Sequence, residues 1–114
     1  MEEVVVRPWG TYQTILRGTT FQVKRIVVNP KSKLSLQSHE HRSEHWIVVE
    51  GVGTITLNED AIIASRDKHV YIPLGAIHRM SNDTDEPVVF IEIQNGDYLG
   101  EDDIKRYEDI YGRN

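Results

Sequence analysis

The sequence predicts an all-β domain, an antiparallel sandwich or barrel with one short C-terminal helix. Short β-branched runs recur along the chain and are separated by turn residues, which is typical of such folds. The 114 residues are enough for one hydrophobic core. No repeat, low-complexity stretch or linker interrupts them, so we expect residues 1–114 to form a single domain.

The strand pattern is clearest where apolar residues alternate with polar ones. Phe21 to Val28 alternates and ends at Asn29-Pro30, which is a turn signal. Val88 to Gln94 is the last and clearest run. The other expected strands are Leu34 to His41, Glu44 to Glu50, Thr54 to Leu57, Ala61 to Ala64 and Val70 to Ile72. The spacing of the turn signals predicts roughly nine to eleven strands.

The tail predicts the helix, from about Asp102 to Ile110. Acidic residues precede it, where a helix N-terminus attracts negative charge. Ile104, Tyr107 and Tyr111 follow at helical spacing, and Gly112 would stop the helix.

Composition excludes several classes of protein. Thirteen basic and eighteen acidic residues give a net charge of −5, which disfavours binding to nucleic acid. The absence of cysteine excludes disulfides, thiolate metal sites and cysteine nucleophiles. The apolar runs are far too short to span a membrane, and the N-terminus lacks the basic region of a signal peptide. We therefore expect a cytoplasmic protein with no membrane partner.

Both faces of the Glu44 to Glu50 strand carry apolar groups. Glu44, Trp46 and Val48 share one face, and His45 and Ile47 lie on the other. A sheet with one solvated face would leave that face polar. The pattern therefore predicts that a second sheet, a terminal segment or a second subunit covers the outer face, and favours a homodimer.

Three of the five histidines fall within seven residues. On a strand, Gln37, His39 and His41 would point to one face, with Glu44 close by. Histidines and a carboxylate that converge in this way suit a divalent metal. The alternative is a polar strand whose histidines face water. His45 has the opposite parity and is expected to be structural or interfacial, and His69 is expected at the surface.

A second motif favours the metal site over the solvent-facing strand. Pro73, Gly75, His78 and Asn82 follow the spacing Pro-x-Gly-x-x-His-x-x-x-Asn. Together with the histidine cluster, Glu44 and Gly51, this resembles the paired motifs of the cupin superfamily. The resemblance implies a jelly-roll β-barrel with one divalent metal in its mouth, and a turn at Pro73 and Gly75 that aims His78 inward.

The resemblance also implies a ligand set. His39 precedes Glu44 by five residues, as the second histidine of the cupin motif usually does, so the expected ligands are Gln37, His39, Glu44 and His78. Such a set resembles the zinc site of phosphomannose isomerases. His41 is an alternative ligand or a neighbouring group. Zinc, manganese, iron, nickel and cobalt are not distinguished.

A narrower resemblance covers residues 6 to 113. It rests on Arg-Pro-Trp-Gly at 7–10, Arg-Ser-Glu-His-Trp at 42–46, Tyr-Ile-Pro at 71–73, Leu-Gly-Glu-Asp-Asp-Ile at 99–104 and Tyr-Gly-Arg at 111–113. These segments resemble the type II mannose-6-phosphate isomerase cupin domain, usually the C-terminal part of a bifunctional enzyme that also makes GDP-mannose. Glu40 replaces a histidine common in that family. The nucleotidyltransferase region is absent from these residues, so guanylyltransferase activity is not expected of this chain alone.

This family resemblance implies an isomerase that interconverts mannose 6-phosphate and fructose 6-phosphate. The metal would polarise the carbonyl, and Glu92 or His41 would be the general base. Without the resemblance, Glu92 and Gln94 read as a solvent-facing strand edge. Arg42 is the first candidate for the substrate phosphate. The other cationic candidates are Lys24, Lys33 and Arg79.

Two other functions remain open at this stage. The chain could be a non-catalytic module that binds metal or sugar phosphate and partners a separate mannose-1-phosphate guanylyltransferase. It could also perform a different cupin reaction, such as oxygen-dependent cleavage, if the metal is iron. Trp9 and Trp46 are expected to pack in the core, although a tryptophan at a barrel mouth can stack on a sugar.

Overall fold

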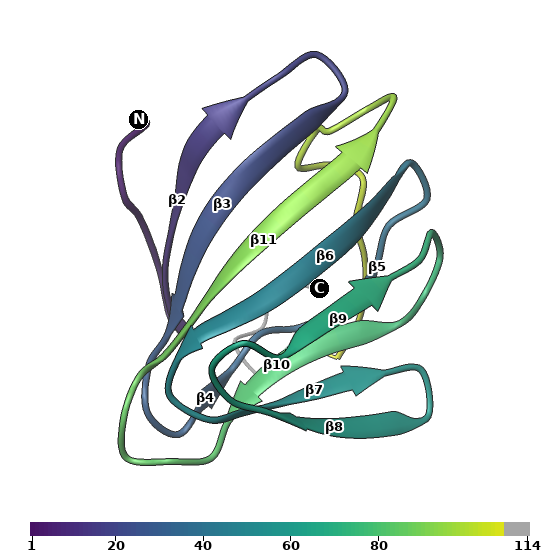
Figure 1. Ribbon diagram of the computed structural model, residues 1–114. Helices are drawn as coiled ribbons and strands as arrows, with labels where there is room; N and C mark the ends of the chain where they lie inside the picture. Colours follow the sequence, from purple (N-terminus) through teal and green to yellow (C-terminus); the bar gives the residue numbers. More distant parts are fainter. Residues whose placement is uncertain (109–114) are drawn as a thin grey trace.

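The computed structural model describes residues 1–108, which form twelve β-strands in two antiparallel sheets (Figure 1). The first sheet has the order β1-β2-β3-β11-β6-β9, and the second β12-β5-β10-β7-β8, with β4 paired to β10. The strands are β1 Val5–Arg7, β2 Gly10–Arg17, β3 Phe21–Val28, β4 Ser32–Lys33, β5 Leu36–Ser38, β6 Arg42–Glu50, β7 Gly53–Leu57, β8 Asp60–Ala64, β9 His69–Ile72, β10 His78–Asn82, β11 Val88–Gly96 and β12 Lys105–Glu108.

The expected all-β jelly roll is confirmed. The two sheets lie face to face, although their hydrogen bonds do not close into a continuous barrel. The described chain has more strands than the nine to eleven expected, because two-residue β4 and strand β12 add to them.

Alternation along the central strands builds the core. β11 lies between β3 and β6, and its inward residues Val88 and Phe90 are fully buried. Trp46, Val48 and Ile26 pack against them from the neighbouring strands. The apolar core fills one end of the space between the sheets. Further along β11, Glu92 and Gln94 replace the apolar residues, so the other end of the same interior is polar.

The expected helix from Asp102 to Ile110 is wrong over the residues the structure describes. Lys105–Glu108 is instead strand β12, which pairs with β5 through Lys105 opposite Ser38 and Arg106 opposite Gln37. The hydroxyl groups of Tyr107 and Ser38 lie 3.0 Å apart. The free edge of β5 thus overrides the local helical spacing. Residues 109 and 110 lie outside the described residues. Nothing in residues 1–108 forms a helix long and apolar enough to cross a membrane.

The expected strand from Leu34 to His41 is also broken. β5 ends at Ser38, and the backbone amides of Glu40 and His41 both donate to the carboxylate of Asp103, each at 3.0 Å. These two amides therefore bind a side chain instead of a neighbouring strand. Arg42, which lies between two of the expected strands, is the first residue of β6.

The two faces of β6 differ as its parity predicted. Glu44, Trp46 and Val48 are buried between the sheets, whereas His45 and Ile47 stay partly exposed on the outer face. Ile91 and Ile93 of β11 extend this outer apolar surface. Homodimer formation through this surface remains a prediction.

Candidate metal centre

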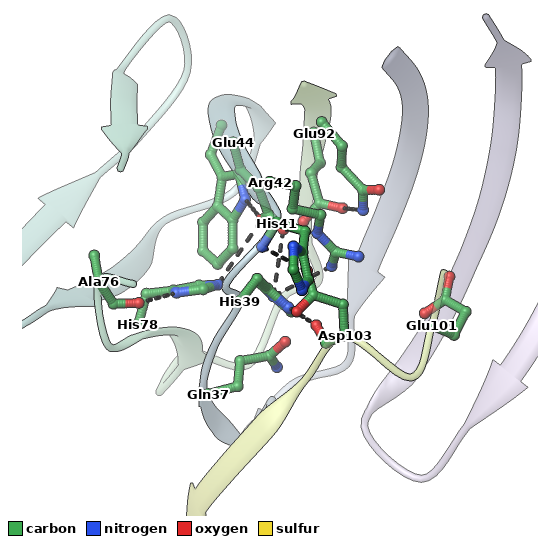
Figure 2. A network of polar contacts seen from close by, with 12 residues as sticks. Gln37, His39, His41, Arg42, Glu44, Ala76, His78, Glu92, Glu101 and Asp103 are labelled. Atoms are coloured by element: carbon green, nitrogen blue, oxygen red, sulfur yellow. Dashed lines mark hydrogen bonds and ion pairs between the residues drawn. The ribbon is translucent and has the colours of Figure 1, made fainter. Parts of the chain in front are cut away.

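Three buried side chains from different segments meet between the two sheets: His39, Glu44 and His78 (Figure 2). Their ligand atoms all lie within 4.8 Å of one another. Nε2 of His39 is 3.4 Å from one carboxylate oxygen of Glu44, and Nε2 of His78 is 3.8 Å from the other. Ligands about 2.1 Å from a tetrahedral ion are about 3.4 Å apart. The group could therefore bind a metal with small adjustments.

Backbone carbonyls fix which nitrogen each histidine presents. Nδ1 of His39 lies 2.6 Å from the carbonyl of Asp103, and Nδ1 of His78 lies 2.9 Å from that of Ala76. Each Nδ1–H donates to its carbonyl, which leaves the Nε2 lone pair facing Glu44. Nε2 of His78 is buried and has no hydrogen-bond partner within residues 1–108. A metal would satisfy this atom, so the side chains fit such an ion.

The charges of the group suit a cation. Burial lowers the pKa of His39, which keeps the imidazole neutral and able to bind metal. Burial opposes ionisation of Glu44, but the positive charge of Arg42 outweighs it and holds the pKa of Glu44 low, at about 2. Glu44 accepts hydrogen bonds from Nε of Arg42 and Nε1 of Trp46, both at 2.8 Å. A charged carboxylate thus faces the Nε2 atoms of His39 and His78.

The turn before β10 connects the two histidine segments. Gly75 has φ +78°, a conformation that favours glycine, and its amide donates to the carbonyl of His39 at 2.9 Å. The amide of Ala76 donates to the carbonyl of Pro73 at 3.1 Å. His78 is buried and points to the interior. The structure therefore has the turn at Pro73 and Gly75 that the sequence motif predicted.

Gln37 and His41 take different places. Gln37 lies directly opposite His78 in the pairing of β5 with β10, so the two residues share a face. Its amide nitrogen donates to the carbonyl and hydroxyl of Ser35, which leaves the amide oxygen for a metal. His41 follows the end of β5 and is exposed, with its ring edge against Tyr98. The structure does not bring His41 into the group.

Glu92 is buried beside Glu44. Burial raises the pKa of Glu92 to about 8, and the negative charge of Glu44 adds to the effect. Nε2 of Gln94 donates to Glu92 at 2.6 Å, and Nε2 of Gln22 donates to the amide oxygen of Gln94 at 2.5 Å. Arg17 donates to the amide oxygen of Gln22 at 2.6 Å. A row of hydrogen bonds thus connects the protein surface to the interior carboxyl.

A cavity of about 170 Å³ adjoins the group. Arg42, Glu92 and Gln94 line it, and so does Gln37. Other lining residues include Arg7, Trp9, Tyr12, Lys24, Ser35, Glu101 and Arg106. Lys33 and Arg79, which the sequence also suggested for phosphate binding, form ion pairs with Glu108 and do not line this cavity.

Two histidines and two tryptophans named in the sequence analysis lie outside the metal group. Nδ1 of His45 and Nε2 of His69 lie 2.9 Å apart on the outer face, so His69 is exposed but has a partner. Trp9 and Trp46 pack in the core.

Sequence reasoning missed Asp103 and Arg106. Because a helix was expected around Asp103, its contacts with His39, Glu40 and His41 were not predicted. The strand that carries Arg106 was not predicted for the same reason. Asp103 lies within the Leu-Gly-Glu-Asp-Asp-Ile segment, and Arg106 follows it by two residues. The specificity of that segment for the family was the available signal that these residues have a function.

Solved structures with the same fold define the class of protein. CapF, a capsular polysaccharide assembling protein from Staphylococcus aureus, matches with a TM-score of 0.81 at 22% identity, over 94% of this chain and 34% of that one. A cupin-2 domain protein, Rru_A2000 from Rhodospirillum rubrum, matches with a TM-score of 0.72 at 22% identity, over 83% of this chain and 68% of that one. The chain has the cupin fold.

Sequence relatives narrow this class. The family model described as "Mannose-6-phosphate isomerase C-terminal" matches residues 1–109, and the chain belongs to that family. The xanthan biosynthesis protein XanB of Xanthomonas campestris is 53% identical over 109 residues, 96% of this chain. The mannose-1-phosphate guanylyltransferase ManC of Salmonella typhimurium is 47% identical over 113 residues, 99% of this chain. The chain spans 23% and 24% of the length of these two relatives.

Proposed function

We propose that this chain is a metal-dependent isomerase that interconverts mannose 6-phosphate and fructose 6-phosphate, in the synthesis of precursors such as GDP-mannose. The observation that carries the proposal is the buried group of His39, Glu44 and His78 with the protonatable Glu92 beside it. The family to which the chain belongs supports the choice of substrate, and relatives named for xanthan and alginate biosynthesis support the pathway.

His39, Glu44 and His78 would hold one divalent metal ion, with Gln37 as the fourth ligand through its amide oxygen. When bound, the ion supplies Lewis-acid polarisation of the sugar carbonyl. The carbonyls of Asp103 and Ala76 keep both histidines in the tautomer that offers Nε2.

Glu92 would move the proton. As a carboxylate it takes the proton from C2 of mannose 6-phosphate, and as a carboxylic acid it returns that proton to C1 of the enediol. The hydroxyl proton passes from the oxygen on C2 to the oxygen on C1, so the two sugars are isomers and no redox partner is needed. A carboxyl with a pKa of about 8 is suited to both halves of this transfer near neutral pH. His41 is exposed and less favourably placed for the role.

A coupled assay tests the proposal. The purified chain would be loaded separately with zinc, manganese, iron, nickel and cobalt, and turnover of mannose 6-phosphate would be measured. We expect turnover with at least one ion. Glu92→Gln should keep its metal and lose about 10²–10⁴-fold in rate. The matched control is Glu59→Gln, which changes an exposed carboxyl in a turn and should change nothing. A chain that binds metal but turns over no sugar phosphate with any ion would contradict the proposal.

The alternative is a binding module that serves a separate mannose-1-phosphate guanylyltransferase. What favours it is that one relative over the matched region, ManC, is named a mannose-1-phosphate guanylyltransferase. Sedimentation of the chain mixed with a purified guanylyltransferase tests it, since a module of this kind should form a complex of higher mass.

A further inference from the structure

Positive charge gathers in the cavity beside the metal group. The chain carries a net charge of −5, yet Arg7, Lys24, Arg42 and Arg106 all line this one cavity. The acidic residues that line it are Glu92 and Glu101. A cavity of this charge attracts an anion.

Arg42 already contacts side chains of the metal group, so most of its guanidinium is not available to an anion. Its Nε donates to Glu44 at 2.8 Å, and its Nη2 lies 3.2 Å from Nε2 of His39. The guanidinium is therefore held by Glu44 and His39, and only Nη1, which is buried, has no partner within residues 1–108. An anion that needs two hydrogen bonds from one arginine would have to be held by another residue.

Arg106 has the position and the unused hydrogen-bonding group for this role. It lies opposite Gln37 in the pairing of β12 with β5, and Gln37 lies opposite His78 in the pairing of β5 with β10. The three residues thus form one row across the interior face. Nε of Arg106 is buried without a hydrogen-bond partner, and Arg106 forms no ion pair within the described part of the chain.

Lys24 contributes a second buried cation from the opposite sheet. Its side chain is only 5% exposed, and Nζ lies 4.7 Å from the centre of the Tyr12 ring. Nζ also lies 2.5 Å from a carboxylate oxygen of Glu101, whose side chain is 64% exposed. Glu101 belongs to the loop between β11 and β12. An exposed carboxylate therefore already places an anionic oxygen on this buried ammonium group.

We infer that Arg106 and Lys24 form an anion subsite that takes the phosphate of the sugar, and that Glu101 occupies part of it in the free protein. The identity of the ligand rests on the proposed function. Two strand spacings separate Arg106 from His78, about 10 Å. The phosphorus of an open-chain hexose 6-phosphate lies about 8–9 Å from C1 by ordinary bond lengths. A sugar with its carbonyl at the metal group thus reaches Arg106 with its phosphate.

The test measures binding of inorganic phosphate by titration calorimetry, before and after treatment with a chelator. Arg106→Gln should weaken binding about 10–100-fold in both states, because charge-assisted hydrogen bonds are lost. Arg106→Lys should weaken it less, since the charge remains but the two-pronged geometry does not. Lys105→Gln is the matched control, because this adjacent residue is exposed and points to the opposite face. Glu101→Gln should tighten binding, because the competing carboxylate is gone.

Kinetics with mannose 6-phosphate separate this inference from the proposed function. In an active chain, Arg106→Gln should raise KM with a smaller effect on kcat. Phosphate binding that depends on Arg106 in a chain without turnover would support the subsite and contradict the isomerase. Turnover with phosphate affinity and KM unchanged in Arg106→Gln would overturn the subsite and leave the isomerase standing. Weaker phosphate binding by Glu101→Gln would contradict the part assigned to Lys24.

Discussion

Glu92→Gln should make the metal-free protein more stable than wild type at pH 8 and no more stable at pH 4. In the folded protein, burial raises the pKa of Glu92 from 4.5 to about 8. Below pH 4.5 the carboxyl is protonated in the folded and unfolded states alike. Between pH 4.5 and 8 the unfolded chain releases the proton and the folded chain keeps it, so the wild type loses stability as the pH rises. Glutamine does not titrate and lacks this loss.

The size of the effect follows from the same window. Each pH unit contributes about 1.4 kcal/mol to the free energy of unfolding, which sets a ceiling of about 5 kcal/mol across the whole interval. Glutamine can still accept the hydrogen bond from Gln94. The substitution therefore removes the titration with little change in packing, and the difference between the two proteins at each pH isolates the contribution of Glu92.

Urea unfolding at pH 5, 6, 7 and 8 in the presence of a chelator measures this difference, with the fluorescence of the buried Trp9 and Trp46 as the signal. We expect the stability difference to widen steadily and to exceed about 2 kcal/mol at pH 8. Glu59→Gln, on the surface, should follow the wild type throughout. Parallel curves for wild type and Glu92→Gln over this range would refute the reasoning that burial holds the proton on Glu92.

Three further predictions concern the metal and the outer sheet face. His78→Ala should lose more than about 100-fold in metal affinity and keep its β-sheet circular dichroism, whereas His69→Ala should keep its metal; elemental mass spectrometry of the purified proteins checks both. Asp103→Ala removes the acceptor for the backbone amides of Glu40 and His41 and should weaken metal binding about 10–100-fold with every ligand still present, as a metal titration would reveal. The wild type should sediment as a dimer at micromolar concentration and Ile93→Lys as a monomer; a monomeric wild type would contradict the predicted dimer.

Strand periodicity was sufficient to predict most of the fold, because the pattern of buried residues in β3, β6 and β11 is local. The parity of β6 placed Glu44 inside and His45 outside, and the spacing of the second motif placed His78 behind a turn. The C-terminal strand could not be predicted in this way. Ile104 and Tyr107 have helical spacing, and only the unpaired edge of β5, a distant segment, decides that residues 105–108 extend.

The metal group was harder to predict, because a tertiary contact of Asp103 decides whether His41 joins His39 in it. Had β5 continued, His41 would share the face of His39 and Gln37. Asp103 binds the backbone after Ser38, so His39 turns inward and His41 stays outside. The sequence contains a signal for the burial of Lys24, because Lys24 alternates in phase with Ile26 and Val28. The cavity that Lys24 lines could not be predicted in this way, because residues of the facing sheet form its other wall.

The hydrogen bonds from Arg17 to Glu92 have a fixed direction. A guanidinium can only donate, so Gln22 must turn its oxygen to Arg17 and its nitrogen to Gln94, which must then donate to Glu92. Neither amide can flip alone without setting two donors or two acceptors against each other. The orientation of a buried carboxyl is therefore decided at the rim of the molecule, where the arginine also binds Glu2. Arg17 and Glu2 at that rim therefore influence the site, although neither lines the cavity beside the metal group.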